Sequence, residues 1–236
     1  MDTQMKNIYR LGAVATFMLL IGIIIDIVFG SMSSGGDLTT LPQSAVAHFE
    51  QFRTNWLLGL YNLDLLNSIM QLISIPVFFV LFLAHRKSES ALALLGLVLF
   101  LVGATLFVSG NVALPMFELS GKYFTADSDA QRSLFAAAGE ALLIRGSHGS
   151  FGVFFAFILP SLAGIVMSLA MLRGKVFSRL NSWLGILGGA LLLCYIVLVT
   201  FFPGTKSIAI AMAMPGGLMQ MAWMLLFSIR LLLLSL

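Results

Sequence analysis

Six runs of this sequence are long enough to cross a bilayer and contain at most one charged residue each. They lie at about residues 11–29, 60–84, 90–117, 149–172, 180–203 and 207–230. The hydrocarbon core of a membrane requires about 20 residues of helix, and lipid leaves backbone groups no hydrogen-bond partner outside their own helix. The chain is therefore predicted to be all-α, a polytopic membrane protein built as a six-transmembrane-helix bundle.

The charge content excludes a water-soluble globule. Only 10% of the residues are charged and 59% are apolar, whereas a soluble domain carries about 25% charged residues. The net charge of +3 could suggest a nucleic-acid partner, but the 13 Lys and Arg residues form no basic run or face. We therefore predict a bilayer around the chain, no nucleic-acid partner, and a single integral membrane domain over residues 1–236.

The basic residues are divided unequally between the two sides of the predicted membrane. Eight of the 13 Lys and Arg would lie on the side of the termini and five on the opposite side. The eight are Lys6, Arg10, Arg86, Lys87, Arg173, Lys175, Arg179 and Arg230. Because cytoplasmic loops are enriched in Lys and Arg, both termini are predicted to be cytoplasmic, and the other connections to be on the outer side.

The first outer connection contains a pattern typical of a helix start. Thr40 followed by Gln43 has the spacing of a capping box, in which each side chain satisfies a backbone N–H of the first turn. Apolar residues such as Ala45 and Phe49 recur four residues apart after it. The pattern predicts a short amphipathic helix over 41–54, on the outer leaflet or over the bundle.

The second outer connection contains a similar pattern. Ser128 followed by Gln131 again has capping-box spacing, which predicts a second short outer helix from Asp129 toward Ile144. The segment 120–127 is expected to be a loop between this helix and the third span.

The second span is longer than a bilayer requires and carries a polar face. Residues 56–83 would form about 42 Å of helix at 1.5 Å per residue, so the outer end is expected to project beyond the lipid. The polar residues that share one helix face are Tyr61, Asp64, Asn67, Ser68, Gln71 and Ser74. They predict either the wall of a cavity that receives a solute or cation, or hydrogen bonds between helices that orient the bundle.

A second group of polar residues lies in or near the outer connections. It comprises Glu118, Glu140, Arg145 and His148, together with His48, Glu50 and Asp26. These side chains could converge on a polar ligand or a metal. Zinc requires three or four ligands, and the third histidine, His85, is on the opposite side, so no metal is predicted. Glu140 and Arg145 are more simply interpreted as a loop ion pair.

Small residues form two helix-packing patterns. Gly96, Gly103 and Gly110 recur every seven residues, and Gly185 with Gly189 forms a GxxxG motif. Such faces let helices approach closely, within one chain or between protomers, so a homo-oligomer stays open. No nucleotide-binding, zinc-protease or serine-hydrolase motif occurs. No cofactor is predicted, and an enzyme is the less favoured interpretation.

Several segments at the edges of the predicted spans form a combination that is similar to a known family. They are Tyr9-Arg10-Leu11-Gly12, Trp56 before the long second span, Met171-Leu172-Arg173-Gly174-Lys175-Val176-Phe177, Trp183-Leu184-Gly185-Ile186, and Ala222-Trp223-Met224 leading to Arg230-Leu231. Together they resemble an uncharacterised family of six-span bacterial inner-membrane proteins, classed as a domain of unknown function. The resemblance implies the same fold and the bacterial inner membrane, and it transfers no active site.

Three hypotheses about function follow. The first is a protein that binds or passes a small molecule or cation through an outward-facing polar cavity. The second is a non-catalytic subunit or scaffold that binds a partner through its glycine-rich faces, and the third is an intramembrane hydrolase in which Asp64, Glu118 and His148 converge. The candidate ligand-binding residues are Asp64, Asn67, Ser68, Gln71, Glu118, Glu140, Arg145 and His148.

Overall fold

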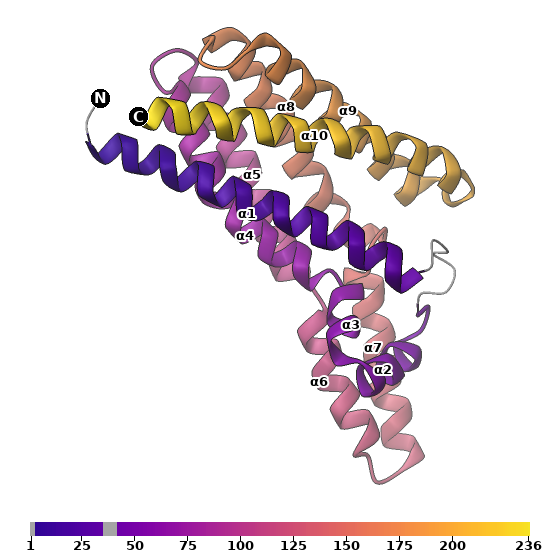
Figure 1. Ribbon diagram of the computed structural model, residues 1–236. Coiled ribbons are helices and arrows are strands. Elements are labelled where there is room, and N and C mark those ends of the chain that lie inside the picture. Colours follow the sequence, from indigo (N-terminus) through magenta and orange to yellow (C-terminus); the bar gives the residue numbers. More distant parts are fainter. Residues whose placement is uncertain (1–2, 35–41) are drawn as a thin grey trace.

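The described part of the protein folds as a helical bundle. The computed structural model describes residues 3–34 and 42–236, in which the regular structure is helical and contains no strand. Six helices are long and apolar enough to cross a membrane (Figure 1). They are α1 (Thr3–Ser34), α4 (Leu65–His85), α5 (Ser90–Gly110), α8 (Phe154–Gly174), α9 (Arg179–Phe201) and α10 (Lys206–Ser235). The predicted all-α membrane bundle is confirmed.

The six long helices form a closed ring in sequence order. α1, α4, α5, α8, α9 and α10 each pack against the next, and α10 packs back against α1. Aromatic stacking supports the ring, since the rings of Phe78 in α4 and Phe100 in α5 lie 4.1 Å apart and nearly parallel. Met167 of α8 and Phe227 of α10 are fully buried in the same core.

Two glycines of the predicted packing faces contact neighbouring helices of the same chain. A Cβ atom at Gly103 of α5 would lie 2.5 Å from Cδ of Pro160 in α8. A Cβ atom at Gly185 of α9 would collide with Oγ of Ser168 in α8 and with the indole of Trp223 in α10. Both glycines are therefore required for close contact between neighbouring helices of the ring.

Both ends of the chain lie at the same end of the bundle. α1 and α10 run side by side (Figure 1), and Nζ of Lys6 donates to the carbonyl oxygen of Leu236 at 2.6 Å. Arg230 lies at this end as well and donates from Nε to the carbonyl oxygen of Val176 at 3.2 Å. The cytoplasmic orientation of this end stays a prediction.

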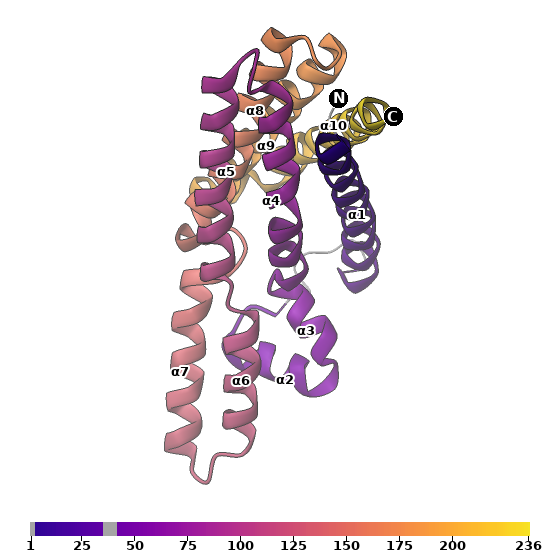
Figure 2. The ribbon, with the colours of Figure 1, turned by 90° about the vertical axis from the view of Figure 1, so that its left-hand side faces the viewer.

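Four short helices form a cap at the opposite end of the bundle (Figure 2). They are α2 (Ala45–Thr54), α3 (Trp56–Asn62), α6 (Ala113–Phe124) and α7 (Asp129–Gly146). The cap has its own apolar core, which includes Phe49, Phe52, Leu60, Met116 and Leu143. The sequence predicted only two short outer helices, and that number was too low.

The additional cap helices arise because two predicted spans are broken. The predicted span at 60–84 begins at Leu65, after a break at 63–64, and the one at 90–117 ends at Gly110, before a break at 111–112. α4 and α5 each contain 21 residues, or about 32 Å of helix, which matches a hydrocarbon core of about 30 Å. The apolar residues beyond the breaks belong to the cap.

α2 begins later than predicted and is buried inside the cap. Its N-cap is Ser44, whose Oγ accepts from the backbone N–H of Ala47 at 3.2 Å, so the helix starts at Ala45. Thr40 of the predicted capping box lies outside the described residues. The predicted apolar face is correct, since Ala45 and Phe49 are fully buried, but it packs against α6 and α7 rather than lipid.

The second predicted helix start is confirmed. Oγ of Ser128 accepts from the backbone N–H of Gln131 at 3.3 Å, and α7 begins at Asp129. The expected loop at 120–127 was too early, because α6 continues through Phe124. α6 and α7 thus form a helical hairpin that extends beyond α2 and α3 (Figure 2).

Candidate functional site

The candidate site is at the boundary between the cap and the bundle, where the chain breaks before α4. Asp64 has φ 61° and ψ 27°, a left-handed conformation that ends α3 and redirects the chain into α4. Aspartate is one of the few non-glycine residues that adopts this conformation readily. Its carboxylate caps no backbone N–H of α4, so it is free to bind other side chains.

The Asp64 carboxylate binds side chains from two elements. Nδ1 of His148 donates to Oδ2 of Asp64 at 3.2 Å, and Nδ2 of Asn67 donates to Oδ1 at 2.8 Å. His148 lies in the turn at 147–150 between α7 and α8, where Gly149 has φ 79°. Only glycine enters that region without strain, so Gly149 lets the chain turn immediately after the histidine.

Tyr195 of α9 extends this polar chain across the bundle. Its hydroxyl lies 3.1 Å from Nε2 of His148. Both ring nitrogens of His148 are therefore engaged, one with the carboxylate of Asp64 and the other with a phenol. The arrangement is a carboxylate, an imidazole and a phenol in sequence, which holds the ring of His148 in one orientation.

The two charged groups of this chain stabilise each other. Burial favours the neutral form of Asp64, but the hydrogen bond and charge of His148 and the hydrogen bond from Asn67 outweigh it and lower the pKa of the carboxyl group. Burial also opposes protonation of His148, but the hydrogen bond and charge of Asp64 raise its pKa to about 10. At neutral pH the pair is ionised on both sides.

A second carboxylate approaches from α1. The hydroxyl of Tyr61 in α3 donates to the backbone carbonyl of Asp26 at 2.8 Å, and its ring lies 5.9 Å from that of Phe29. Burial, followed by the charge of Asp26, raises the pKa of Tyr61, so its hydroxyl keeps the donated proton. Asp26 interacts electrostatically with both Asp64 and His148. The end of α1 is therefore attached to the site.

A cavity of about 200 Å³ opens beside His148. Its walls are Pro42, Gln43, His48, Asn62, Leu63, Leu143, Ser147 and His148. Two smaller spaces of about 10 Å³ each lie nearby, one against Asp64 and Asn111 and the other against His148 and Tyr195. Each small space has room for about one water molecule. Of these three spaces, the one beside His48 and Asn62 has room for more than a single water molecule.

The structure merges two groups of residues that the sequence analysis kept apart. Asp64 and Asn67 came from the polar face of the second span and His148 from the outer residues, and they now share one hydrogen-bond chain. Oγ of Ser68 donates to the backbone oxygen of Asp64 at 3.1 Å. Gln71 lies farther along α4, and its Oε1 is buried with no partner among the described residues.

Three predicted residues lie away from this cluster. Glu118 is exposed and pairs with Lys122 at 2.6 Å, so it does not converge with Asp64 and His148. Oε1 of Glu140 accepts from the backbone N–H of Ala45 at 2.7 Å, which caps the start of α2. Among the described residues Glu140 forms no ion pair with Arg145, which is exposed. The expected loop ion pair was wrong because Glu140 points toward α2.

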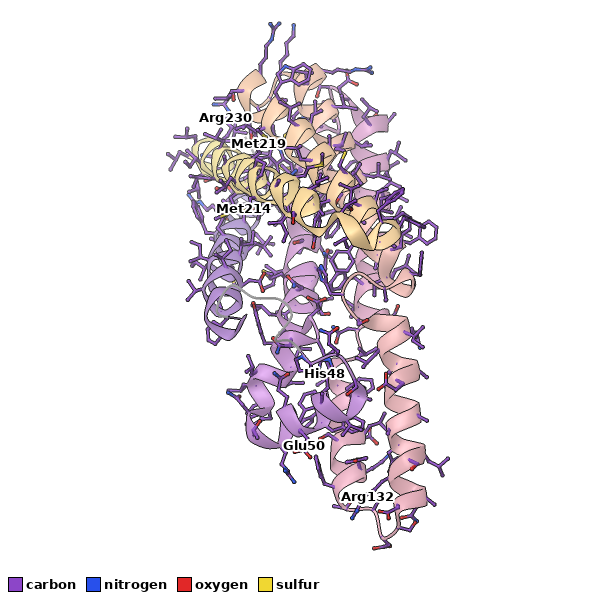
Figure 3. All side chains as sticks on the ribbon, turned by 90° about the vertical axis from the view of Figure 1, so that its right-hand side faces the viewer. His48, Glu50, Arg132, Met214, Met219 and Arg230 are labelled. Atoms are coloured by element: carbon purple, nitrogen blue, oxygen red, sulfur yellow. The ribbon has the colours of Figure 1, made fainter. Side chains whose placement is uncertain are left out.

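The predicted outer residues were also considered as metal ligands. Within residues 3–34 and 42–236, no three His, Cys, Asp or Glu side chains are arranged to hold a metal ion. His48, one of the candidates considered for such a site, lies instead in the cavity wall, inside the cap, with Glu50 nearer its surface (Figure 3).

Sequence reasoning missed two residues that help to build the site. Tyr195 stands alone in an apolar run, and only the rule that a buried phenol usually needs a partner could have singled it out. Nδ2 of Asn111 donates to the backbone oxygen of Leu63 at 2.8 Å, while Oδ1 accepts from Ala113. The sequence signal that could have identified Asn111 was the Gly110-Asn111 pair at the end of an apolar run, because such residues favour a turn.

Comparison with known proteins identifies a family and no more specific relative. Neither a curated protein nor a solved structure matches the chain. A family described as a domain of unknown function (DUF4386) matches residues 14–229, which include all six membrane-spanning helices in whole or in large part. The chain therefore belongs to this family of domains of unknown function, DUF4386, as a multi-pass membrane protein.

Proposed function

We propose that this protein binds a small polar molecule in the cavity between the cap and the bundle, on the outer face of a bacterial inner membrane. The observation that carries the proposal is the cavity of about 200 Å³ that has His148 in its wall. Behind this wall, His148 is fixed by Asp64 and Tyr195. A concave space with a few polar groups held in place is the usual form of a small-molecule site.

The walls of the cavity come from separate parts of the chain. His48 is supplied by α2, Asn62 by α3 and His148 by the turn before α8. Convergence of polar side chains from three elements is costly unless they are satisfied by one another, by water or by a ligand. This supports a binding role for the cavity over a purely structural one.

Binding is better supported than passage across the membrane. The cavity has about 200 Å³ of free space, and two separate volumes near Asp64 and Tyr195 have about 10 Å³ each. Such volumes admit about one water molecule each. The long helices also pack in a closed ring around an apolar core. The packing of the bundle therefore supports binding in the cavity rather than passage through it.

The other two hypotheses have less support from the structure. The scaffold hypothesis relied on glycine-rich faces. Gly103 and Gly185 contact neighbouring helices of the same chain, whereas a Cβ atom at Gly110 would meet nothing within 4 Å. The hydrolase hypothesis required Glu118 beside Asp64 and His148, whereas Glu118 pairs with Lys122. The outer location of the cavity follows from the eight basic residues predicted at the opposite, cytoplasmic end.

The proposal can be tested with three probes of matched size. Melting temperature of the full chain in detergent would be measured with ethanolamine, ethylene glycol and glycolate at millimolar concentration. We expect at least one probe to raise the melting temperature by a few degrees, because a ligand that binds only the folded state stabilises it. Absence of any shift would refute the proposal.

Two variants locate the binding. Ser147→Phe places a ring in the cavity wall, whereas Ser133→Phe adds the same ring to an exposed position of α7. The probe should stabilise Ser133→Phe as it stabilises the wild type and should not stabilise Ser147→Phe. A shift that survives Ser147→Phe would mean that the probe binds elsewhere.

A further inference from the structure

The ring nitrogens of His148 are not available to a ligand in the cavity. Nδ1 is engaged with Asp64 at 3.2 Å and Nε2 with Tyr195 at 3.1 Å. Although His148 is charged, it has no N–H left to donate to an anion. A carboxylate or phosphate in the cavity would therefore lack the donor that usually recognises it.

His48 lines the same cavity and carries a buried polar atom without a partner among the described residues. The residue is only 5% exposed, and its Nδ1 is buried with no partner among the described residues. Burial lowers the pKa of His48, against the opposing charge of Glu140, so the ring is neutral at pH 7. A neutral imidazole carries one acceptor nitrogen, and leaving a buried polar atom unpaired is costly.

Asn62 adds a second acceptor to the cavity wall. Its Nδ2 donates to Oε1 of Gln51 at 3.1 Å. This bond uses the amide nitrogen and leaves the carbonyl oxygen Oδ1 to accept a hydrogen bond. The hydroxyl of Ser147 can donate or accept. The available groups therefore suit a ligand that donates hydrogen bonds.

The charges around the two cavity histidines also favour a hydrogen-bond donor, and in particular a positively charged one. Asp64 and Asp26 interact electrostatically with His148, and Glu140 interacts with His48. Three carboxylates thus act on one imidazolium and one neutral imidazole. The excess of negative charge attracts a cation and repels an anion.

We infer that the ligand of this cavity is a small organic cation with N–H donors, such as a protonated primary amine. The inference rests on the proposed function and names the chemical class that the cavity takes. The ammonium group would donate to Oδ1 of Asn62 and to the acceptor nitrogen of His48. The carboxylates would supply the electrostatic attraction without direct contact.

The same three probes distinguish this inference from its alternatives. Ethanolamine, ethylene glycol and glycolate differ mainly in whether one end is an ammonium, a hydroxyl or a carboxylate. Ethanolamine should bind at least tenfold more tightly than ethylene glycol, because hydrogen bonds from a charged donor are about twice as strong as neutral ones. Glycolate should give no stabilisation.

Variants of the two acceptors test the contact directly. Asn62→Asp keeps the side-chain shape and adds a negative charge, so affinity for ethanolamine should rise about tenfold. Ser133→Asp adds the same charge on α7, away from the cavity, and should leave affinity unchanged. His48→Phe removes the acceptor nitrogen while keeping a ring, and affinity should fall about tenfold or more.

The outcomes distinguish failure of the inference about the ligand class from failure of the proposed binding function. Preference for glycolate would overturn the inference and leave the proposed function standing. Equal affinity for ethanolamine in Asn62→Asp and the wild type would also overturn it, and this result does not depend on whether His48→Phe folds. If no probe stabilises the wild type, the proposed function itself fails.

Discussion

His148 and Asp64 form an ion pair, with 3.2 Å between Nδ1 and Oδ2, although 84 residues separate them in the sequence. Asp64 precedes α4 and His148 precedes α8, and these helices are not consecutive in the ring, because α5 lies between them in its order. The pair therefore connects the starts of two membrane helices across the bundle, at the level where the cap begins.

Asp64→Asn and Asp64→Leu should differ in stability. Asparagine adopts the left-handed conformation of Asp64 and can still bind Asn67 or His148, whereas leucine is strained at φ 61° and leaves both partners unpaired. We expect Asp64→Leu to lower the free energy of unfolding by about 2 kcal/mol more than Asp64→Asn. Thermal melting in detergent measures the difference. Equal melting temperatures would mean that neither the backbone conformation nor the hydrogen bonds matter.

The contribution of the ion pair should depend on pH. Asp64 raises the pKa of His148 from 6.5 to about 10, so the stabilisation is fully present below pH 6.5 and is lost as pH rises toward 10. The pKa of Asp64 is lowered from 3.8, so its contribution is lost as pH falls below that value. The difference in melting temperature between wild type and Asp64→Asn should be largest near pH 5–6 and shrink by pH 10. A constant difference over pH 5–10 would contradict the ion pair.

Gly139 should be required for the docking of α2 on α7. A Cβ atom at Gly139 would lie 2.7 Å from Cβ of Ala45 and 2.9 Å from Cζ of Phe49, both fully buried. Gly139→Ala is expected to destabilise the protein by about 1–3 kcal/mol. Gly121→Ala in α6 is the control, because a Cβ atom there meets nothing within 4 Å. It should be neutral or stabilising by melting temperature.

Chemical labelling should report the accessible and buried sides of α2 and of the segment just before it. Single cysteines in a Cys194→Ser background would be treated with a water-soluble thiol reagent. Labelling should be strong at Gln43 and Glu50, which are accessible, and weak at Ala45 and Phe49, which are buried. Equal labelling at all four positions would show that α2 does not pack in the cap.

Reporter fusions should place the cap on the outer side of the membrane. Alkaline phosphatase, which is active only outside the cytoplasm, should be active when fused after Asp127 in the loop between α6 and α7. It should be inactive after Lys87 or Lys175, at the end that carries the eight basic residues. The reverse pattern would place the cavity on the cytoplasmic side.

The sequence predicted the bundle well because hydropathy reports burial in lipid. All six spans were placed, but the two breaks were not, because cap residues such as Leu60 and Met116 are as apolar as lipid-facing ones. The excess length of the second run was a sign of the break at 63–64, before which the chain belongs to the cap. Hydropathy could not show that the helix turns at Asp64.

The sequence predicted some residues of the site but not the contacts between them. Asp64 and His148 were both candidates because ionisable residues near lipid need partners. Their contact depends on the closure of the helix ring, which brings together segments distant in sequence. Tyr195 carried no periodic signal, and the roles of Glu118 and Glu140 depend on which helix end or lysine lies beside them.

The hydrogen bond from Asn111 to the carbonyl oxygen of Leu63 joins the two helix breaks. A break frees backbone groups, which hydrocarbon cannot satisfy and water can. Exposed aromatic residues also gather beyond the breaks, where Trp56 lies 6.4 Å from Phe117, as is typical of the headgroup region. The two breaks are thus held at one level, and we expect the acyl chains of the membrane to end there.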